Sequence, residues 1–226
     1  MNRKRIILIV AIVAVLGVGA AVLIINNNWG EYESNVVRSE LDDTVTYSNN
    51  EENYPPSLDE IEGIYSVEKL DGNADILFHT EGLKSTKGGF DDFTISFNVL
   101  DDFRQSSLEV VIETESLNTG NSTRDEHLME ADFFDAKKYP QIIFKSSSVE
   151  LGDTSYIAKG ELTLNGTTKK LDVPFQHLGA GGSDGVPFET FEGAFQIDRT
   201  EFGQEESSGV GNIVEISFYC ELKAEA

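Results

Sequence analysis

The chain is poor in cysteine, histidine and positive charge. Its 226 residues include one cysteine, three histidines and 17 lysines and arginines, against 40 aspartates and glutamates. A single cysteine, Cys220, excludes an intramolecular disulfide and a cysteine metal cluster, so the fold depends on its core for stability. The net charge of −23 repels phosphate backbones, which argues against a nucleic-acid partner.

The chain also lacks the common catalytic motifs. We find no nucleophile elbow, P-loop, dinucleotide fingerprint or internal repeat in the sequence. Chemically active residues gather in one short run, Arg124, Asp125, Glu126 and His127. On a helix, consecutive side chains point about 100° apart and cannot converge on one atom. We therefore expect helix capping here, and no enzyme, cofactor or metal; a hydrolase that uses His127 with Asp125 is the catalytic alternative.

The N-terminus carries the longest apolar run, Ile6 to Ile25, preceded by three basic residues. A run of roughly 20 apolar residues is long enough to cross a bilayer as a helix. The basic residues keep the N-terminus in the cytoplasm. Residues 6–25 therefore predict a transmembrane anchor, with the rest of the chain on the periplasmic side of the inner membrane. A cleaved signal peptide, with Gly17 to Ala21 as its processing site, is the alternative, and it would give a secreted protein.

Residues 27–60 are polar and acidic, and they end in Pro55-Pro56. They show no sustained helical or strand period, which is typical of a flexible linker. We therefore divide the chain into residues 1–26 as the anchor or signal, 27–60 as the linker and 61–226 as the folded domain.

Alternation of apolar and polar residues recurs through the folded domain and predicts a series of short strands. Turn signals separate them: Lys87-Gly88-Gly89, Asn165-Gly166 and Gly179 to Gly185. Asn165-Gly166 predicts a two-residue hairpin. The predicted strands are Gly63–Lys69, Ala74–Glu81, Phe93–Val99, Leu108–Ser116, Gln141–Val149, Ser155–Ala158, Glu161–Asn165, Lys170–Phe175, Phe191–Asp198 and Val214–Leu222. Such a series predicts an all-β antiparallel sheet, closed into a barrel or folded into a sandwich.

One helical window interrupts the strands, from Ser122 to Phe134. Asn121 or Ser122 can serve as its N-cap, and acidic residues fall in the first turn, where the helix dipole favours them. Tyr139-Pro140 is the expected end of the helix.

Several motifs resemble those of the YceI-like family. "RDEHLMEADFFDAKKYPQIIFKSSSVE" from Arg124, "GELTLNGT" from Gly160 and "FQIDRTEFG" from Phe195 each match an element of the family pattern. The resemblance implies a lipocalin-like antiparallel β-barrel that binds an isoprenoid or similar lipid chain in the bacterial envelope. Two departures stand out: His79 is one position off the family register, and "GAGGSDGVPFE" replaces a Trp-Gly-Gly loop.

The residues that we expect to contact a ligand are the inward apolar side chains and one histidine near the helix. They are Phe78, Phe93, Phe97, Ile112, His127, Phe133, Phe134, Phe144, Phe195 and Phe218. Cys220 shares the inward face of the last strand. Whether the barrel is hollow stays open, because barrels of this size are either filled or hold one ligand. A filled envelope interaction domain is the alternative function, and assembly as a homodimer stays open too.

Overall fold

A computed structural model describes residues 32, 34, 36–42, 45, 56–69, 73–83, 85–183, 186–207 and 209–225. Eleven strands of this part form one antiparallel sheet. They are β1 (Gly63–Glu68), β2 (Ala74–Thr80), β3 (Thr86–Phe90), β4 (Phe93–Val99), β5 (Ser107–Glu113), β6 (Leu117–Asn118), β7 (Gln141–Leu151), β8 (Tyr156–Leu164), β9 (Thr167–Ser183), β10 (Val186–Asp198) and β11 (Ile213–Ala224). One α-helix, α1 (Ser122–Leu128), and four 3₁₀ turns, η1 (Leu58–Glu60), η2 (Phe103–Gln105), η3 (Thr114–Ser116) and η4 (Arg199–Phe202), complete the described elements.

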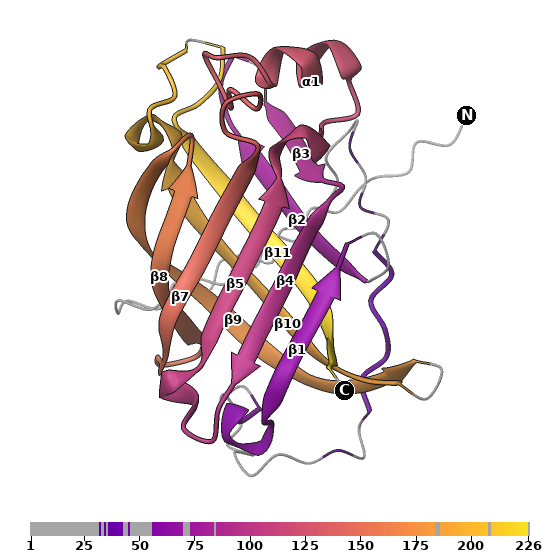
Figure 1. The fold of residues 1–226 in the computed structure, drawn as a ribbon. Helices are drawn as coiled ribbons and strands as arrows, with labels where there is room; N and C mark the ends of the chain where they lie inside the picture. Colours follow the sequence, from indigo (N-terminus) through magenta and orange to yellow (C-terminus); the bar gives the residue numbers. More distant parts are fainter. Residues whose placement is uncertain are drawn as a thin grey trace, which may run out of the picture.

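The sheet closes into a barrel, as the resemblance to the YceI-like family implies. Its order is β1-β4-β5-β7-β8-β9-β10-β11, and β11 pairs back onto β1. This closure uses the C-terminal end of β11, where Lys223 and Ala224 pair with β1. The rest of β11 pairs with β2, which continues through β3 to β6. Figure 1 shows the strands tilted around one axis, with α1 lying across one end.

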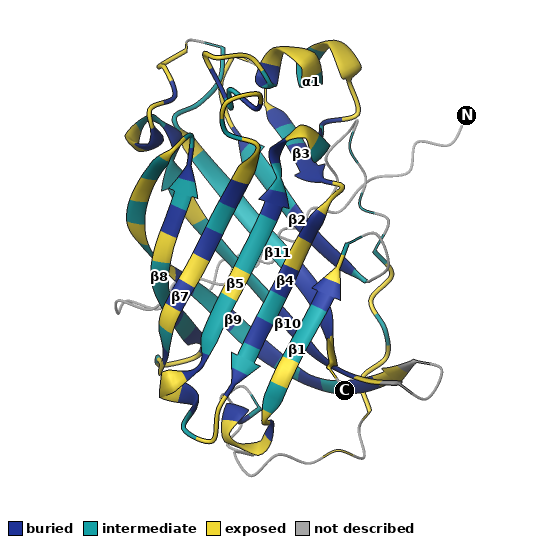
Figure 2. Cartoon of the chain, in the orientation of Figure 1, coloured by how far each residue is buried: buried dark blue, intermediate teal, exposed yellow. Residues whose placement is uncertain are grey.

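Alternation places one face of each barrel strand inside. In β4 the buried residues are Phe93, Ile95, Phe97 and Val99, and the residues between them are exposed or half-buried. β7 repeats the pattern, visible as alternating colours along the strand in Figure 2. The core is therefore the barrel interior, lined on all sides by apolar side chains.

Two glycine-rich segments predicted as turns continue strands, and one strand was predicted as two. Lys87-Gly88-Gly89 lies within β3, and β9 runs on through Gly179 to Ser183. The two strands predicted on either side of Gly160 are one strand, β8. At Gly88 an added Cβ would lie 2.5 Å from the carbonyl oxygen of Asn118. Glycine here allows strands and rings to approach closely. By contrast, Asn165 and Gly166 have φ values of 50° and 69°, which confirms the predicted hairpin.

Helix α1 begins where expected and ends early. The Asn121 side chain accepts a hydrogen bond from the Arg124 backbone N–H at 3.1 Å, which makes Asn121 the N-cap. The helix stops at Leu128, well before the predicted end at Tyr139-Pro140. Residues 129–139 continue as turns, with Asp135 in the left-handed region at φ 45°.

The described residues of the predicted linker lie against the barrel, in contrast to the expected free tether. The Ser39 backbone N–H and hydroxyl both donate to the Glu221 carboxylate at 3.0 Å. Arg38 pairs with Glu192 at 2.8 Å, and the Asp42 N–H donates to the Ala180 carbonyl at 2.9 Å. Acidic side chains of β10 and β11 supply the contacts to Ser39 and Arg38, and the backbone of β9 supplies the contact to Asp42. Local sequence patterns do not reveal such contacts.

The predicted membrane anchor, residues 6–25, lies outside the described part. Within that part, no helix combines the length and the apolar character that crossing a bilayer requires.

Candidate functional site: an interior cavity

An apolar cavity of about 170 Å³ lies inside the barrel. Almost every barrel strand contributes inward side chains to it, mostly phenylalanine, leucine, isoleucine and valine. Among the described residues, the lining holds one charged side chain, that of Arg199. Its uncharged polar side chains, in the same part of the chain, are those of Thr80, Thr86 and Gln204. Such a surface offers burial to an apolar ligand and few polar contacts.

A cluster of aromatic rings fills the barrel beneath the cavity, at the end away from α1. The Phe97 ring packs edge-on against Phe175 and Phe191, with centroids 5.8 and 5.5 Å apart. Phe175 in turn stacks on Tyr156 at 5.6 Å. The barrel is thus packed at one end and hollow toward the other.

Eight of the ten residues predicted to contact a ligand line this cavity: Phe78, Phe97, Ile112, Phe133, Phe134, Phe144, Phe195 and Phe218. Phe93 is 1% exposed and belongs to the core, outside the lining. His127 is also outside the lining, and its side chain is 65% exposed. The geometry therefore brings the inward apolar residues together and leaves the histidine in solvent.

Phe133 and Phe134 close the cavity from the α1 side. Adjacent residues of a helix point about 100° apart, so a helix continued to Phe134 would turn one ring away. Because the helix ends at Leu128, both rings reach the lining. Phe134 also packs edge-on against Phe90 with centroids 6.3 Å apart.

The polar residues of the lining gather at this same end. The Thr80 hydroxyl and the Arg199 guanidinium both donate to the Gly211 carbonyl, at 3.0 and 2.9 Å. Thr86 is the strand partner of Thr80. The guanidinium carbon of Arg199 lies 5.8 Å from the centroid of the Phe133 ring, within the range of a cation–π contact.

The YceI-like domain model matches residues 65–222, which span most of the barrel. The chain belongs to the YceI-like family. A UPF0312 protein of Vibrio cholerae is 33% identical over 144 residues, which are 62% of this chain and 76% of that protein. The crystal structure of the Campylobacter jejuni YceI protein is 27% identical with a TM-score of 0.58, covering 65% of this chain and 89% of that one. A polyisoprenoid binding domain from Saccharophagus degradans has a TM-score of 0.55 at 12% identity, over 73% of this chain and 100% of that one, and so shows the shared fold.

The charged run that opens the longest family motif holds the helix in place. The Asp125 carboxylate accepts hydrogen bonds from the backbone N–H and hydroxyl of Thr119. Arg124 donates to the Thr119 hydroxyl at 2.8 Å and to its carbonyl at 2.9 Å. His127 contacts Asp132 at 3.3 Å instead of Asp125. The structure therefore does not assemble the His127–Asp125 pair that a hydrolase would need.

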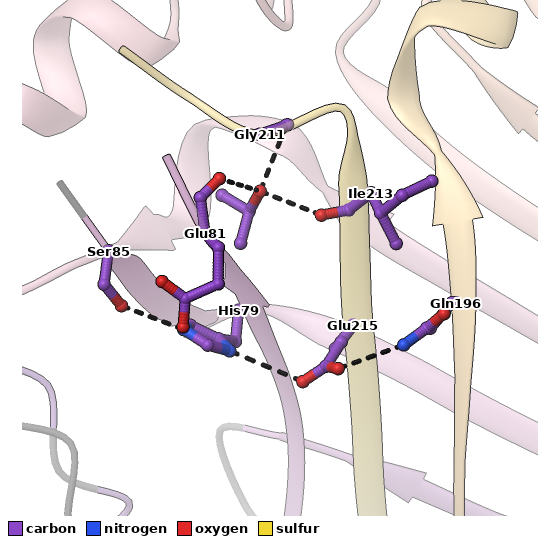
Figure 3. A network of polar contacts seen from close by, with 8 residues as sticks. His79, Glu81, Ser85, Gln196, Gly211, Ile213 and Glu215 are labelled. Atoms are coloured by element: carbon purple, nitrogen blue, oxygen red, sulfur yellow. Dashed lines mark hydrogen bonds and ion pairs between the residues drawn. The ribbon is translucent and has the colours of Figure 1, made fainter. Parts of the chain in front are cut away.

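The histidine that departs from the family register, His79, lies on the outer face of β2. Its ring contacts the Glu215 carboxylate at 3.4 Å and the Ser85 hydroxyl at 2.9 Å, and Gln196 donates to the same carboxylate at 3.0 Å (Figure 3). His79 does not appear in the cavity lining, so these contacts join the outer faces of neighbouring strands.

Cys220 lines the cavity and is buried, as its place on the inward face predicts. Burial raises the pKa of its thiol above the ordinary value. The thiol therefore stays protonated and acts as a small apolar group.

Sequence reasoning missed several lining residues. Phe175 and Phe191 follow the strand alternation and could have been included on that signal. Arg199 and Gln204 follow the end of β10 in the "IDRTEFG" segment and the residue after it, where no periodicity indicates which side chains face the interior.

Proposed function

We propose that the protein binds an elongated hydrophobic chain, an isoprenoid or another lipid, without catalysis. The observation that carries this proposal is the apolar cavity of about 170 Å³ in the hollow half of the barrel. Burial of apolar surface supplies affinity of about 0.8 kcal/mol per CH₂ group, before the entropic costs of binding.

The size of the cavity suits a segment of such a chain. An apolar cavity of about 150 Å³ can take up benzene, so a volume of about 170 Å³ holds a few carbon units. A longer chain would extend past Phe133 and Phe134, among the turns that residues 129–139 form after α1. The neighbour from Saccharophagus degradans is described as polyisoprenoid binding, which makes an isoprenoid the first ligand to test.

We place this function in the bacterial cell envelope. The basis is the apolar run at residues 6–25 with its basic flank, which predicts either an inner-membrane anchor or an export signal. Fusion of alkaline phosphatase to the C-terminus would be active if the domain is extracytoplasmic and inactive if it remains in the cytoplasm.

Ligand binding can be tested by native mass spectrometry and thermal unfolding. We expect a lipid to co-purify, and an isoprenoid at 100 times its Kd to raise Tm by about 5 to 10 °C, because such binding contributes about 2.7 kcal/mol. Val110→Phe should reduce binding, since Val110 lines the cavity. Leu151→Phe, at an exposed position, is the matched control.

The alternative of a filled interaction domain predicts the opposite result. If no lipid co-purifies and no isoprenoid changes Tm, the binding proposal is wrong. Equal binding by Val110→Phe and the wild-type protein would place the ligand elsewhere than in this cavity.

A further inference from the structure

The α1 end of the cavity holds a buried cation, Arg199, which hydrogen-bonds to backbone carbonyls. Arg199 is 3% exposed. Its guanidinium donates to the backbone carbonyls of Glu205 at 2.7 Å, Gly211 at 2.9 Å and Val210 at 3.3 Å. Among the described residues, no carboxylate oxygen lies within 4 Å of it. Three of its five N–H donors have these partners, which leaves two for another acceptor.

Two neutral polar side chains near this cation also lack partners. Gln204 and Thr86 are each 6% exposed, and both line the cavity. In the described part of the chain, neither the Gln204 amide nor the Thr86 hydroxyl makes a hydrogen bond to protein. The polar atoms of both side chains keep some accessible surface at the cavity, so they can hydrogen-bond to a group bound there.

These groups lie at one end of the cavity. Thr80 and Arg199 share the Gly211 carbonyl, Thr86 pairs with Thr80 across β2 and β3, and Gln204 follows η4. The cavity is apolar except at this end, which carries a guanidinium, an amide and a hydroxyl.

Two nearby carboxylates offset part of the positive charge of Arg199. Asp198 and Glu206 act on the Arg199 guanidinium through space. The Asp198 carboxylate, however, accepts hydrogen bonds from the backbone N–H and hydroxyl of Thr200, at 2.9 and 2.6 Å. A buried charge is costly unless a partner of opposite charge contacts it.

We propose that the ligand is an amphiphile whose anionic head, a carboxylate or a phosphate, binds at Arg199, Gln204 and Thr86. Both head groups accept charge-assisted hydrogen bonds from a guanidinium and further bonds from an amide and a hydroxyl. The apolar tail lies in the cavity, so the inference rests on the proposed function. A cationic head is disfavoured by the positive charge of Arg199.

The test compares ligands that share one tail and differ in the head. Dodecanoate, dodecyl phosphate, methyl dodecanoate and dodecyltrimethylammonium are titrated by calorimetry into the full chain, purified without detergent. We expect at least one of the two anions to bind about tenfold or more tightly than the methyl ester and the ammonium compound, the size expected for a hydrogen bond to a charged group. The ratio of dodecanoate to dodecyl phosphate affinity identifies which anion the site prefers.

Substitutions test whether Arg199, Gln204 and Thr86 cause the preference for an anionic head. Gln204→Leu and Thr86→Val should each lower the ratio of anion affinity to ester affinity by about threefold or more. Arg199→Met should make the affinities for the anion and the ester about equal. If the lost contacts with the loop carbonyls prevent this variant from folding, Gln204→Leu and Thr86→Val test the site in its place. Gln105→Leu, at an exposed position in η2, removes the same amide far from the cavity and should leave the ratio unchanged.

The outcomes separate the two proposals. If all four compounds bind equally well, or if the preference survives in Gln204→Leu and Thr86→Val, the head-group site is wrong and the lipid-binding function stands. If none of the four compounds binds, the head-group site is wrong, and the lipid-binding function is decided by the co-purification and isoprenoid measurements.

Discussion

Gly88 lies in the middle of β3, where neighbouring groups leave no room for a side chain. An added Cβ would lie 2.5 Å from the Asn118 carbonyl oxygen and 2.6 Å from the Phe78 ring. Phe78 lines the cavity, so the absence of a side chain at Gly88 helps to set the cavity wall.

Gly88→Ala should therefore destabilise the protein. We expect a loss of about 1 to 3 kcal/mol in the free energy of unfolding, the range for overpacking, measured by urea denaturation. Gly182→Ala is the control, because an added Cβ there meets nothing within 4 Å. A loss of similar size in both variants would show that the effect comes from strand propensity and not from the contact with Asn118 and Phe78.

At the scale of the element, α1 links the capping residues to the wall of the cavity. Asn121 caps the helix, Asp125 and Arg124 tie its first turn to Thr119, and Leu128 ends it in the cavity lining. The helix is short, so its position depends on these contacts more than on its own helical propensity.

Asn121→Ala should cost about 1 kcal/mol in the free energy of unfolding, since it removes the acceptor for the Arg124 N–H. Ser122→Ala, the other candidate cap in the sequence, should stay within about 0.5 kcal/mol. Chemical denaturation of both variants checks this. A larger loss for Ser122→Ala would reverse the assignment of the cap.

At the scale of the whole molecule, the two ends of the barrel differ. The end opposite α1 is plugged by the segment that precedes β1. The Leu58 N–H donates to the Tyr156 hydroxyl at 3.1 Å, and Leu58 is fully buried. His177, whose Nε2 lies 2.7 Å from the Glu189 carboxylate, donates from Nδ1 to the Pro56 carbonyl at 3.1 Å. The ligand that we propose would therefore enter from the α1 end.

Leu58→Ala should reduce the free energy of unfolding by about 2 to 5 kcal/mol, because it leaves a cavity in a packed core. Leu83→Ala, at a position that is 81% exposed, should change it by less than about 0.5 kcal/mol. Thermal unfolding of the two variants provides the comparison. A small effect for Leu58→Ala would show that the plug contributes little to the barrel.

Local sequence patterns account for much of the fold and most of the predicted lining. Alternation identified the inward faces of β4, β7, β10 and β11, and therefore Phe97, Phe144, Phe195 and Phe218. Asn121, Asp125 and the Asn165-Gly166 hairpin were also predictable, because caps and tight turns depend on neighbouring residues. Glycine was the misleading signal at Gly88, which allows close approach between strands instead of marking a turn.

The sequence alone thus determined the class of fold, the family and the apolar face of each strand, since these depend on residues near one another in the chain or on a recognisable motif. Tertiary structure alone decided that the barrel is packed at one end and hollow at the other. It also brought Arg199, Gln204 and Thr86 together and laid Ser39 against Glu221. These features depend on contacts between residues far apart in the sequence, and only the closed sheet fixes the distances between them.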